Sequence, residues 1–128
     1  MYTIGDFLIQ LKNSSKAYKK AVEYPYSNVV FSIAKILEKE GFINKVSAKD
    51  EGSRRLLKIE LKYNKNLPSI SDIKLISKPS VHYYVRKNRM ARAVQKNEVG
   101  IVSTNRGVMT TRDARKQGIG GELICQIY

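Results

Sequence analysis

The chain has 128 residues, 42% of them hydrophobic, which is enough to bury the core of one ordinary domain or of two small lobes. It carries 24 Lys and Arg against 11 Asp and Glu, a formal net charge of +13. Such a surplus in a folded chain favours a polyanionic partner. Nucleic acid is favoured over membrane, because no apolar run approaches the roughly 20 residues that span a bilayer.

Cysteine and histidine each occur once, as Cys125 and His82. An intramolecular disulfide is therefore excluded, and too few ligands are present for a Cys- or His-based metal site. Cys125 lies in a largely apolar run and is expected in the core. Acid–base catalysis would depend on His82, with Glu122 as its most conceivable partner, and nothing in the sequence brings the two together. We expect no catalytic residue, cofactor, metal or small-molecule substrate.

Two amphipathic helices are expected in the first part of the chain. Apolar residues at helical spacing predict a first helix that extends to about Ala21. A second apolar stripe predicts a helix that Ser27 or Asn28 caps and Gly41 ends. The residues of this second stripe are Val30, Ile33, Ala34 and Leu37.

Strands are expected after these helices. Residues 42–46 predict one strand, and residues 57–63, where apolar and charged side chains alternate, predict its hairpin partner across a turn at 49–54. The turn-rich segment 64–71 is expected to link this lobe to a second one. The second lobe is expected to hold strands near residues 72–77, 81–85, 98–103 and 122–128, with a short helix at 111–117. The predicted fold class is α+β, with an N-terminal α-α-β-β-β lobe in residues 1–63 and a mainly β lobe in 72–128.

A basic segment follows the second predicted strand of this later lobe. It places five cations and no acid within eleven residues: Arg86, Lys87, Arg89, Arg92 and Lys96. These side chains would form a phosphate-facing patch, or else a solvated basic face that contacts nothing. Tyr83 and Tyr84 precede the patch. One of the two must point outward on a strand, where its ring would stack on a base or a ribose, and a core position is an equally good interpretation for that ring.

Short polar side chains and glycines dominate residues 103–122. Ser103, Thr104 and Asn105, followed by Arg106 and Gly107, would form a turn that approaches RNA closely enough to read base edges and 2′-OH groups. A plain β-hairpin turn explains the same residues equally well.

The paired glycines Gly120 and Gly121 let a chain pass tightly beside another surface. Glu122, which follows them, would orient a loop or an arginine, or accept a hydrogen bond from a base amino group. An exposed glutamate at the start of a strand is an equally good interpretation.

Residues 100–125, GIVSTNRGVMTTRDARKQGIGGELIC, resemble the C-terminal signature of the bacterial-type small-subunit ribosomal protein eight family. The resemblance continues through Ser77-Lys78-Pro79, through KEGFI at 39–43, and through Asp6 with Lys12 and Asn13. It implies a two-lobe structural protein that binds the central domain of small-subunit (16S-type) rRNA, beside neighbouring small-subunit proteins, and supports subunit assembly. The compartment would be the bacterial cytoplasm or an organellar matrix, mitochondrial or plastid. The family also represses translation of its own mRNA in bacteria, which gives an alternative function.

The family contacts RNA through a Ser-Thr-Ser turn, a Gly-Gly-Glu strand start and an aromatic strand position. The residues that match are Ser103, Thr104, Gly120, Gly121, Glu122 and Tyr84. To these we add as expected RNA contacts Asn105, Arg106, Gly107, Arg86, Lys87, Arg89, Arg92 and Lys12. Asn105 stands where the family usually has Ser, and Glu98 where it usually has Gly. Ile9 and Gln10 replace a usual Thr and Arg, so the first helix is expected to make fewer RNA contacts.

Overall fold

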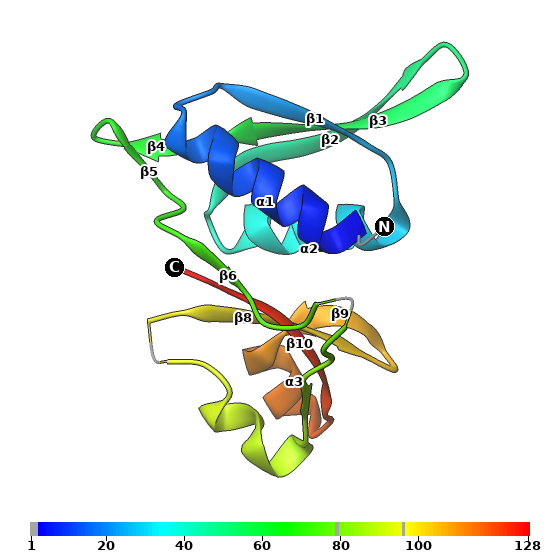
Figure 1. Ribbon diagram of the computed structural model, residues 1–128, viewed down its shortest axis with the longest axis vertical. Coiled ribbons are helices and arrows are strands. Elements are labelled where there is room, and N and C mark those ends of the chain that lie inside the picture. The colour runs from blue at the N-terminus through cyan, green and yellow to red at the C-terminus, as the bar shows by residue number, and fades with distance from the viewer. Residues whose placement is uncertain (1–2, 79, 96) are drawn as a thin grey trace. The chain divides into compact units, whose positions relative to one another are not determined.

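The chain folds into two units, Thr3–Ser71 and Asp72–Tyr128, in a computed structural model that describes residues 3–78, 80–95 and 97–128 (Figure 1). The α+β class is confirmed, with a mainly β C-terminal part that carries one short α-helix. The first unit contains α1 (Thr3–Lys16), β1 (Ala21–Pro25), α2 (Asn28–Lys39), β2 (Ile43–Glu51), β3 (Arg54–Leu61), β4 (Tyr63–Asn64) and β5 (Leu67–Pro68).

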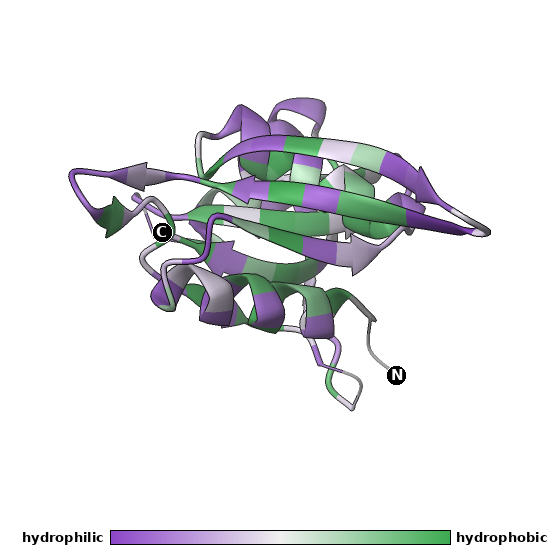
Figure 2. Ribbon diagram, turned by 90° about the horizontal axis from the view of Figure 1, so that it is seen from above, coloured by the Kyte–Doolittle hydropathy of each residue, from purple (hydrophilic) through white to green (hydrophobic). Residues whose placement is uncertain are grey.

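A three-stranded antiparallel sheet, in the order β1-β3-β2, forms the body of the first unit, with α1 and α2 packed on one of its faces (Figure 1). Along β3, buried Leu57, Ile59 and Leu61 alternate with exposed Lys58 and Glu60, as predicted. Figure 2 shows this alternation of hydrophobic and hydrophilic residues along the long strands. Helix α2 buries the four residues of its predicted stripe, and its N-cap is Ser27, whose hydroxyl accepts the N–H of Val30.

The first helix ends at Lys16, so the prediction that it extends to about Ala21 is wrong. Residues Ala21–Pro25 form strand β1 instead, and the unit has the order α-β-α-β-β rather than α-α-β-β-β. Val22 and Tyr24 are buried against β3, whereas Glu23 between them is exposed. This period of two over five residues is a strand signal, and pairing with the edge of β3 fixes it.

The hydroxyl of Tyr24 ties β1 to α1 because it donates to Oδ2 of Asp6 across 2.9 Å. Burial, together with this carboxylate, raises the pKa of Tyr24 to about 12.

The strands of the long hairpin extend further than predicted. β2 and β3 continue to Glu51 and Arg54, so most of the expected turn at 49–54 is strand, and Gly52, with φ of 64°, makes the reversal. The segment expected as a linker includes the small hairpin of β4 and β5. Its two central residues, Lys65 and Asn66, both have positive φ, at 53° and 66°, as a tight type I′ turn requires.

The second unit contains β6 (Ile73–Leu75), β7 (Tyr84–Val85), the 3-10 helix η1 (Lys87–Arg92), β8 (Val99–Thr104), β9 (Gly107–Thr110), α3 (Thr111–Gln117) and β10 (Gly121–Ile127). Its sheet has the order β6-β10-β8-β9, and β7 also pairs with β10. One edge of β10 is thus shared: Cys125 to Ile127 pair with β6, and Gly121 and Glu122 pair with β7.

Helix α3 has the predicted bounds. The hydroxyl of Thr110 caps it by accepting the N–H of Asp113 at 3.1 Å, and Gly118 ends it in the left-handed conformation, with φ of 67°. The core beneath it consists of Val85, Met90, Val102, Met109, Ala114 and Leu123. Cys125 is fully buried in the sheet, as expected, and burial raises the pKa of its thiol to about 12. In the described ranges no helix is long and apolar enough to cross a membrane.

Candidate nucleic-acid interface

Tyr84, Glu122 and Ser103 lie side by side on three neighbouring strands. Glu122 of β10 is directly opposite Tyr84 of β7 on one side and Ser103 of β8 on the other. Opposed residues of antiparallel strands project from the same face, so the three side chains form one row. The next pair along, Leu123 and Val102, belongs to the core on the other face. Residues from distant parts of the sequence therefore share one solvent-facing surface.

A hollow opens beside this row. It is lined by Tyr84, Ser103, Thr104, Asn105, Ile119, Gly120 and Gly121. A Cβ atom on Gly120 would lie 2.6 Å from the carbonyl oxygen of Val85, and one on Gly121 would lie 2.5 Å from the carbonyl oxygen of Ser103. Both distances are too short for real atoms. The expectation that the paired glycines permit a tight passage is confirmed, and the reason is close approach of neighbouring backbone.

The polar turn is a β-hairpin turn between β8 and β9. The hydroxyl of Thr104 donates to the carbonyl oxygen of Gly107 at 2.8 Å and accepts the N–H of Arg106 at 3.1 Å, so it closes the turn. Ser103 and Asn105 are exposed, and neither side chain is hydrogen-bonded to another described residue. The guanidinium of Arg106 donates to Oε1 of Gln117 at 3.3 Å. The side chains of Ser103 and Asn105 are therefore wholly available on the turn, and exposed Arg106 keeps further N–H donors.

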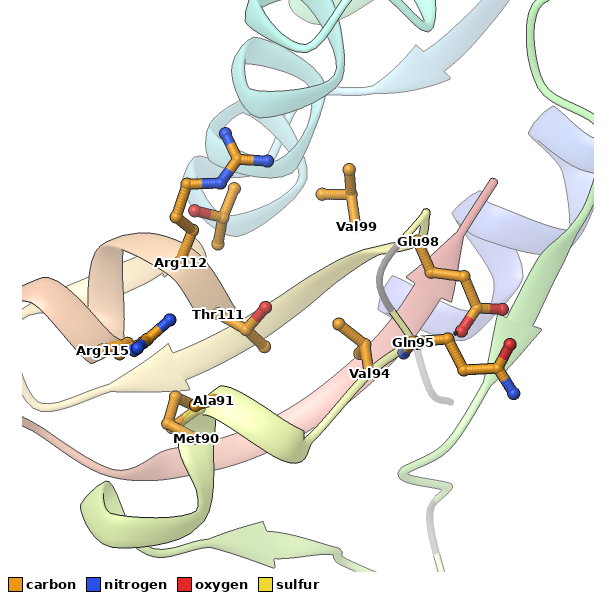
Figure 3. A pocket seen from close by; sticks show the side chains of 10 residues that line it. Met90, Ala91, Val94, Gln95, Glu98, Val99, Thr111, Arg112 and Arg115 are labelled. Carbon is orange, nitrogen blue, oxygen red and sulfur yellow. Dashed lines mark hydrogen bonds between the residues drawn. The ribbon is translucent and has the colours of Figure 1, made fainter.

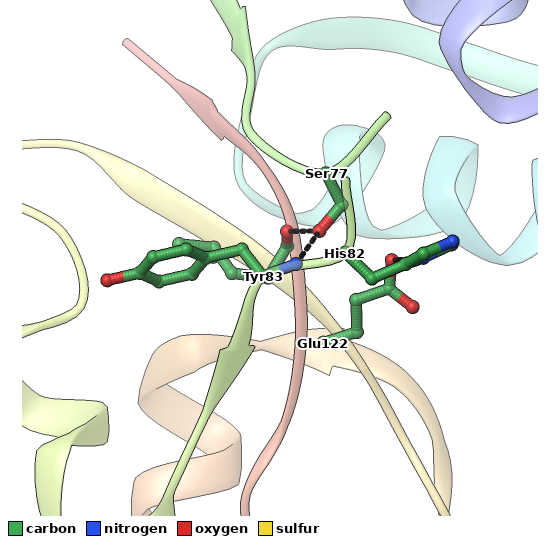
Figure 4. A network of polar contacts seen from close by, with 5 residues as sticks. Ser77, His82, Tyr83 and Glu122 are labelled. Carbon is green, nitrogen blue, oxygen red and sulfur yellow. Dashed lines mark hydrogen bonds and ion pairs between the residues drawn. The ribbon is translucent and has the colours of Figure 1, made fainter. Parts of the chain in front are cut away.

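Nδ1 of His82 and Oε2 of Glu122 lie 2.8 Å apart, within hydrogen-bonding distance, although nothing in the sequence brings these two side chains together. The pair is solvated, since 65% of the His82 side chain is exposed. Figure 4 shows both side chains projecting the same way, whereas the ring of Tyr83 leaves in the opposite direction. Within the described ranges no group of three or more His, Cys, Asp or Glu residues could hold a metal ion.

Buried Ser77 fixes the strand that carries the tyrosines (Figure 4). Its hydroxyl donates to the carbonyl oxygen of Leu123 at 2.6 Å and accepts the N–H of Tyr83 at 3.0 Å. The N–H of Leu123 in turn donates to the carbonyl oxygen of Tyr83 at 2.8 Å. These bonds hold the chain before β7 against β10, although β7 itself has only two residues.

The basic segment lies beside the same tyrosines. Its exposed cations are Arg86, which precedes η1, and Lys87, Arg89 and Arg92 within it. Met90 anchors η1 because it is buried in the core of the unit. A second hollow is lined by Tyr83, Tyr84, Val85, Arg86, Arg89, Arg92 and Ala93, so Tyr84 borders both hollows. Lys96, the fifth cation of the run, lies outside the described residues.

Two expected features belong to the first unit. Lys12 is half-buried on α1 in the first unit and is not part of the group in the second unit. Ile9 and Gln10 of the same helix are exposed.

A further hollow in the second unit, beside α3, has Arg112 and Arg115 at its margin and Glu98 among its lining residues (Figure 3). Gly100 lies close by, where an added Cβ would come within 2.6 Å of Cγ2 of Thr111. None of the expected RNA contacts lines this hollow, so it is separate from the group around Tyr84.

Comparison with known proteins extends over almost the whole chain. The family model for ribosomal protein S8 matches residues 2–128. The chain is 42% identical over 126 residues to the small ribosomal subunit protein uS8 of Thermoanaerobacter sp. (strain X514) and to that of Finegoldia magna. It is 40% identical over 127 residues to the protein of the same name from Prochlorococcus marinus. Each match covers 98% of this chain and 96% of the relative.

Proposed function

Because the chain belongs to the ribosomal protein S8 family, and is thus a structural, non-enzymatic protein of the small ribosomal subunit, we propose that it binds the central domain of small-subunit rRNA and supports assembly of the subunit. The observation that carries the proposal is the row of Tyr84, Glu122 and Ser103, with the glycine-lined hollow beside it. A basic chain that offers an aromatic ring, a free hydroxyl and a free amide on one exposed surface has the chemistry that irregular RNA requires.

The proposed contacts divide into two kinds. Ser103 and Asn105 would read base edges or 2′-OH groups, because their polar groups are not used within the turn. Arg86, Lys87, Arg89 and Arg92 would bind phosphates and fix the register of the RNA, because they are exposed and no acid lies among them.

Tyr84, which lines both hollows, would stack on a base. Thr104, Arg106 and Gly107 would support the turn, and Gly120 and Gly121, which line the hollow, would offer their backbone to RNA there.

Lys12 is proposed as a phosphate contact from the first unit, and neighbouring small-subunit proteins as further partners. The relatives reported above are bacterial, and the proposed compartment is the bacterial cytoplasm or an organellar matrix.

The decisive experiment maps cross-links between the chain and RNA in purified small subunits. Cross-links at residues 103–107 and 120–122 to central-domain nucleotides are expected. Cross-links confined to other residues, or to other rRNA domains, would overturn the proposal.

Repression of the chain's own mRNA through the same surface is the alternative function that the family resemblance raised. No residue of this chain favours it over the ribosomal role. It would be distinguished by whether tagged protein recovers its mRNA from cells or co-sediments with small subunits.

A further inference from the structure

Both adjacent tyrosines of the β7 segment are exposed, with 54% of Tyr83 and 67% of Tyr84 accessible. Side chains alternate between faces on a strand, so only one of the two is accounted for by the row that Glu122 and Ser103 form. That one is Tyr84, which lies opposite Glu122. The side chain of Tyr83 points away from that of His82 (Figure 4), and none of the contacts described above involves its ring.

The ring of Tyr83 is unoccupied although its backbone is fixed. Its N–H and carbonyl oxygen bind Ser77 and Leu123, as described above. The ring itself has no stacking partner, and the hydroxyl no hydrogen bond, among the residues that the structure describes. A backbone held by hydrogen bonds therefore presents a bare aromatic surface of about the size of a base.

The surroundings of this ring are cationic. Arg86, Arg89 and Arg92 line the same hollow, and no acid lines it. Guanidinium groups bind phosphate and also stack on flat rings, whereas an acidic lining would repel RNA. Tyr84 lines both this hollow and the one beside Ser103, so the two hollows share one residue.

We infer that the hollow of Tyr83, Arg86, Arg89 and Arg92 is a second nucleotide-binding position, in which an unstacked RNA base lies on the ring of Tyr83 while the arginines bind the adjoining phosphates. The inference rests on the proposed function, because it extends the RNA path beyond the Ser103 hollow. Tyr84 then separates two nucleotide positions. The occupant is RNA rather than an acidic peptide because a bare ring beside cations supplies stacking as well as charge.

The test compares Tyr83→Ala with Tyr83→Phe, which keeps the ring. The probes are a transcript of the central domain of bacterial small-subunit rRNA and a short poly(uridine) oligonucleotide. Loss of one base stack is expected to weaken binding of both probes by about 10-fold for Tyr83→Ala, and by less than about 2-fold for Tyr83→Phe. The salt dependence should be unchanged, because neither substitution removes a charge. Leu67→Ala, which removes another exposed large hydrophobic side chain, from the first unit, is the matched control and should bind as the unchanged chain does.

Unchanged affinity for both probes in Tyr83→Ala would overturn the inference, and so would equal losses in Tyr83→Ala and Tyr83→Phe. Thermal melting of each variant separates a binding defect from misfolding, and Tyr83→Phe serves as the folded reference. If the unchanged chain shows no preference for the transcript but its binding to poly(uridine) depends on Tyr83, the proposed function fails and this inference stands. Binding of poly(glutamate) that is lost in Tyr83→Ala, with RNA binding intact, would assign the hollow to acidic protein instead and refute the inference.

Discussion

Nδ1 of His82 lies 2.8 Å from Oε2 of Glu122, at the centre of the exposed row that Tyr84 and Ser103 complete. The contact engages one carboxylate oxygen and leaves the other without a hydrogen bond to a described residue. Glu122 is the only acid in a row that is otherwise suited to RNA. An imidazole that holds this carboxylate in one orientation makes it a directed acceptor for a base amino group.

Replacing His82 by Ala is expected to weaken binding of the central-domain transcript by about 2- to 5-fold, the range for one exposed polar contact to a carboxylate. His82→Asn should recover most of the loss, because its amide nitrogen can take the place of Nδ1. Affinities for the transcript and for poly(uridine), measured in parallel, provide the check. Equal losses on the two RNAs in His82→Ala would show that Glu122 is not oriented for specific recognition.

Ser103 and Thr104 are expected to respond differently to alanine. Ser103→Ala should leave the free energy of unfolding unchanged and weaken transcript binding by about 5- to 10-fold, because one hydrogen bond contributes about 1 kcal/mol. Thr104→Ala should lower the free energy of unfolding by about 1 kcal/mol, because its hydroxyl makes two bonds within the turn.

Urea unfolding and filter binding on the same preparations separate the two effects. Thr104→Ser keeps the hydroxyl and serves as the control. A stable Thr104→Ala variant with full affinity would contradict the role assigned to the turn.

A methyl group at Gly121 is expected to destabilise the second unit by about 1–3 kcal/mol, the usual range for overpacking. The added Cβ would meet the carbonyl oxygen of Ser103 at 2.5 Å and Cγ2 of Thr104 at 2.8 Å, and the first of these is backbone that cannot rotate away. Gly121→Ala should therefore reduce both the urea midpoint and transcript affinity. An unaltered midpoint would mean that β8 and β10 separate at little cost.

The basic segment should set the salt dependence of binding. For about six neutralised phosphates, log affinity is expected to fall with log salt at a slope of about −4 to −5. Arg89→Gln and Arg92→Gln should each reduce the magnitude of the slope by about 0.7–0.9 on every RNA, because phosphate contacts carry no sequence information. Arg54→Gln, which removes an exposed arginine from β3, is the control and should leave the slope unchanged. A slope near zero in the unchanged chain would refute the electrostatic account.

Because of Cys125, the free energy of unfolding is expected to decrease at alkaline pH. Burial raises the pKa of its thiol from 9.0 to about 12, so the folded chain holds the proton more tightly than the unfolded chain does. The resulting stability is fully present below pH 9 and is lost as the pH rises toward 12. Tyr24 acts in the same sense, since its pKa rises from 10.0 to about 12. Chemical unfolding between pH 8 and pH 11 should show a shallower decline in Cys125→Ala, and identical slopes in the two proteins would contradict the assignment.

Elements with complete local signals were predictable. Helix α3 has a cap at Thr110, a glycine stop at Gly118 and seven residues between them, and its predicted bounds of 111–117 match the structure. Helix α2 likewise has a capping serine and a four-residue apolar stripe. Strand β1 was missed because its alternation rests on only two apolar residues, Val22 and Tyr24, and pairing with β3 decides the strand.

The residues of the candidate site could be predicted from the sequence, but their arrangement in space could not. The turn and the glycine pair were visible in the sequence, but their meeting at one hollow depends on β10 lying between β7 and β8. The contact of His82 with Glu122 arises from the same pairing, across 40 positions of sequence. Exposure of both tyrosines could not be foreseen, because strand alternation predicts one outward ring where the structure has two.

The hydrogen bonds of the Ser77 hydroxyl affect how much the protein and its RNA would each change conformation on binding. Because this buried group joins Leu123 to Tyr83, the tyrosine segment is already ordered before any RNA arrives. Little of the protein's own conformational freedom is then lost on binding, and the entropy of ordering falls on the RNA, whose bases must leave their stacks to meet a rigid template. The RNA would then change its conformation more than the protein does.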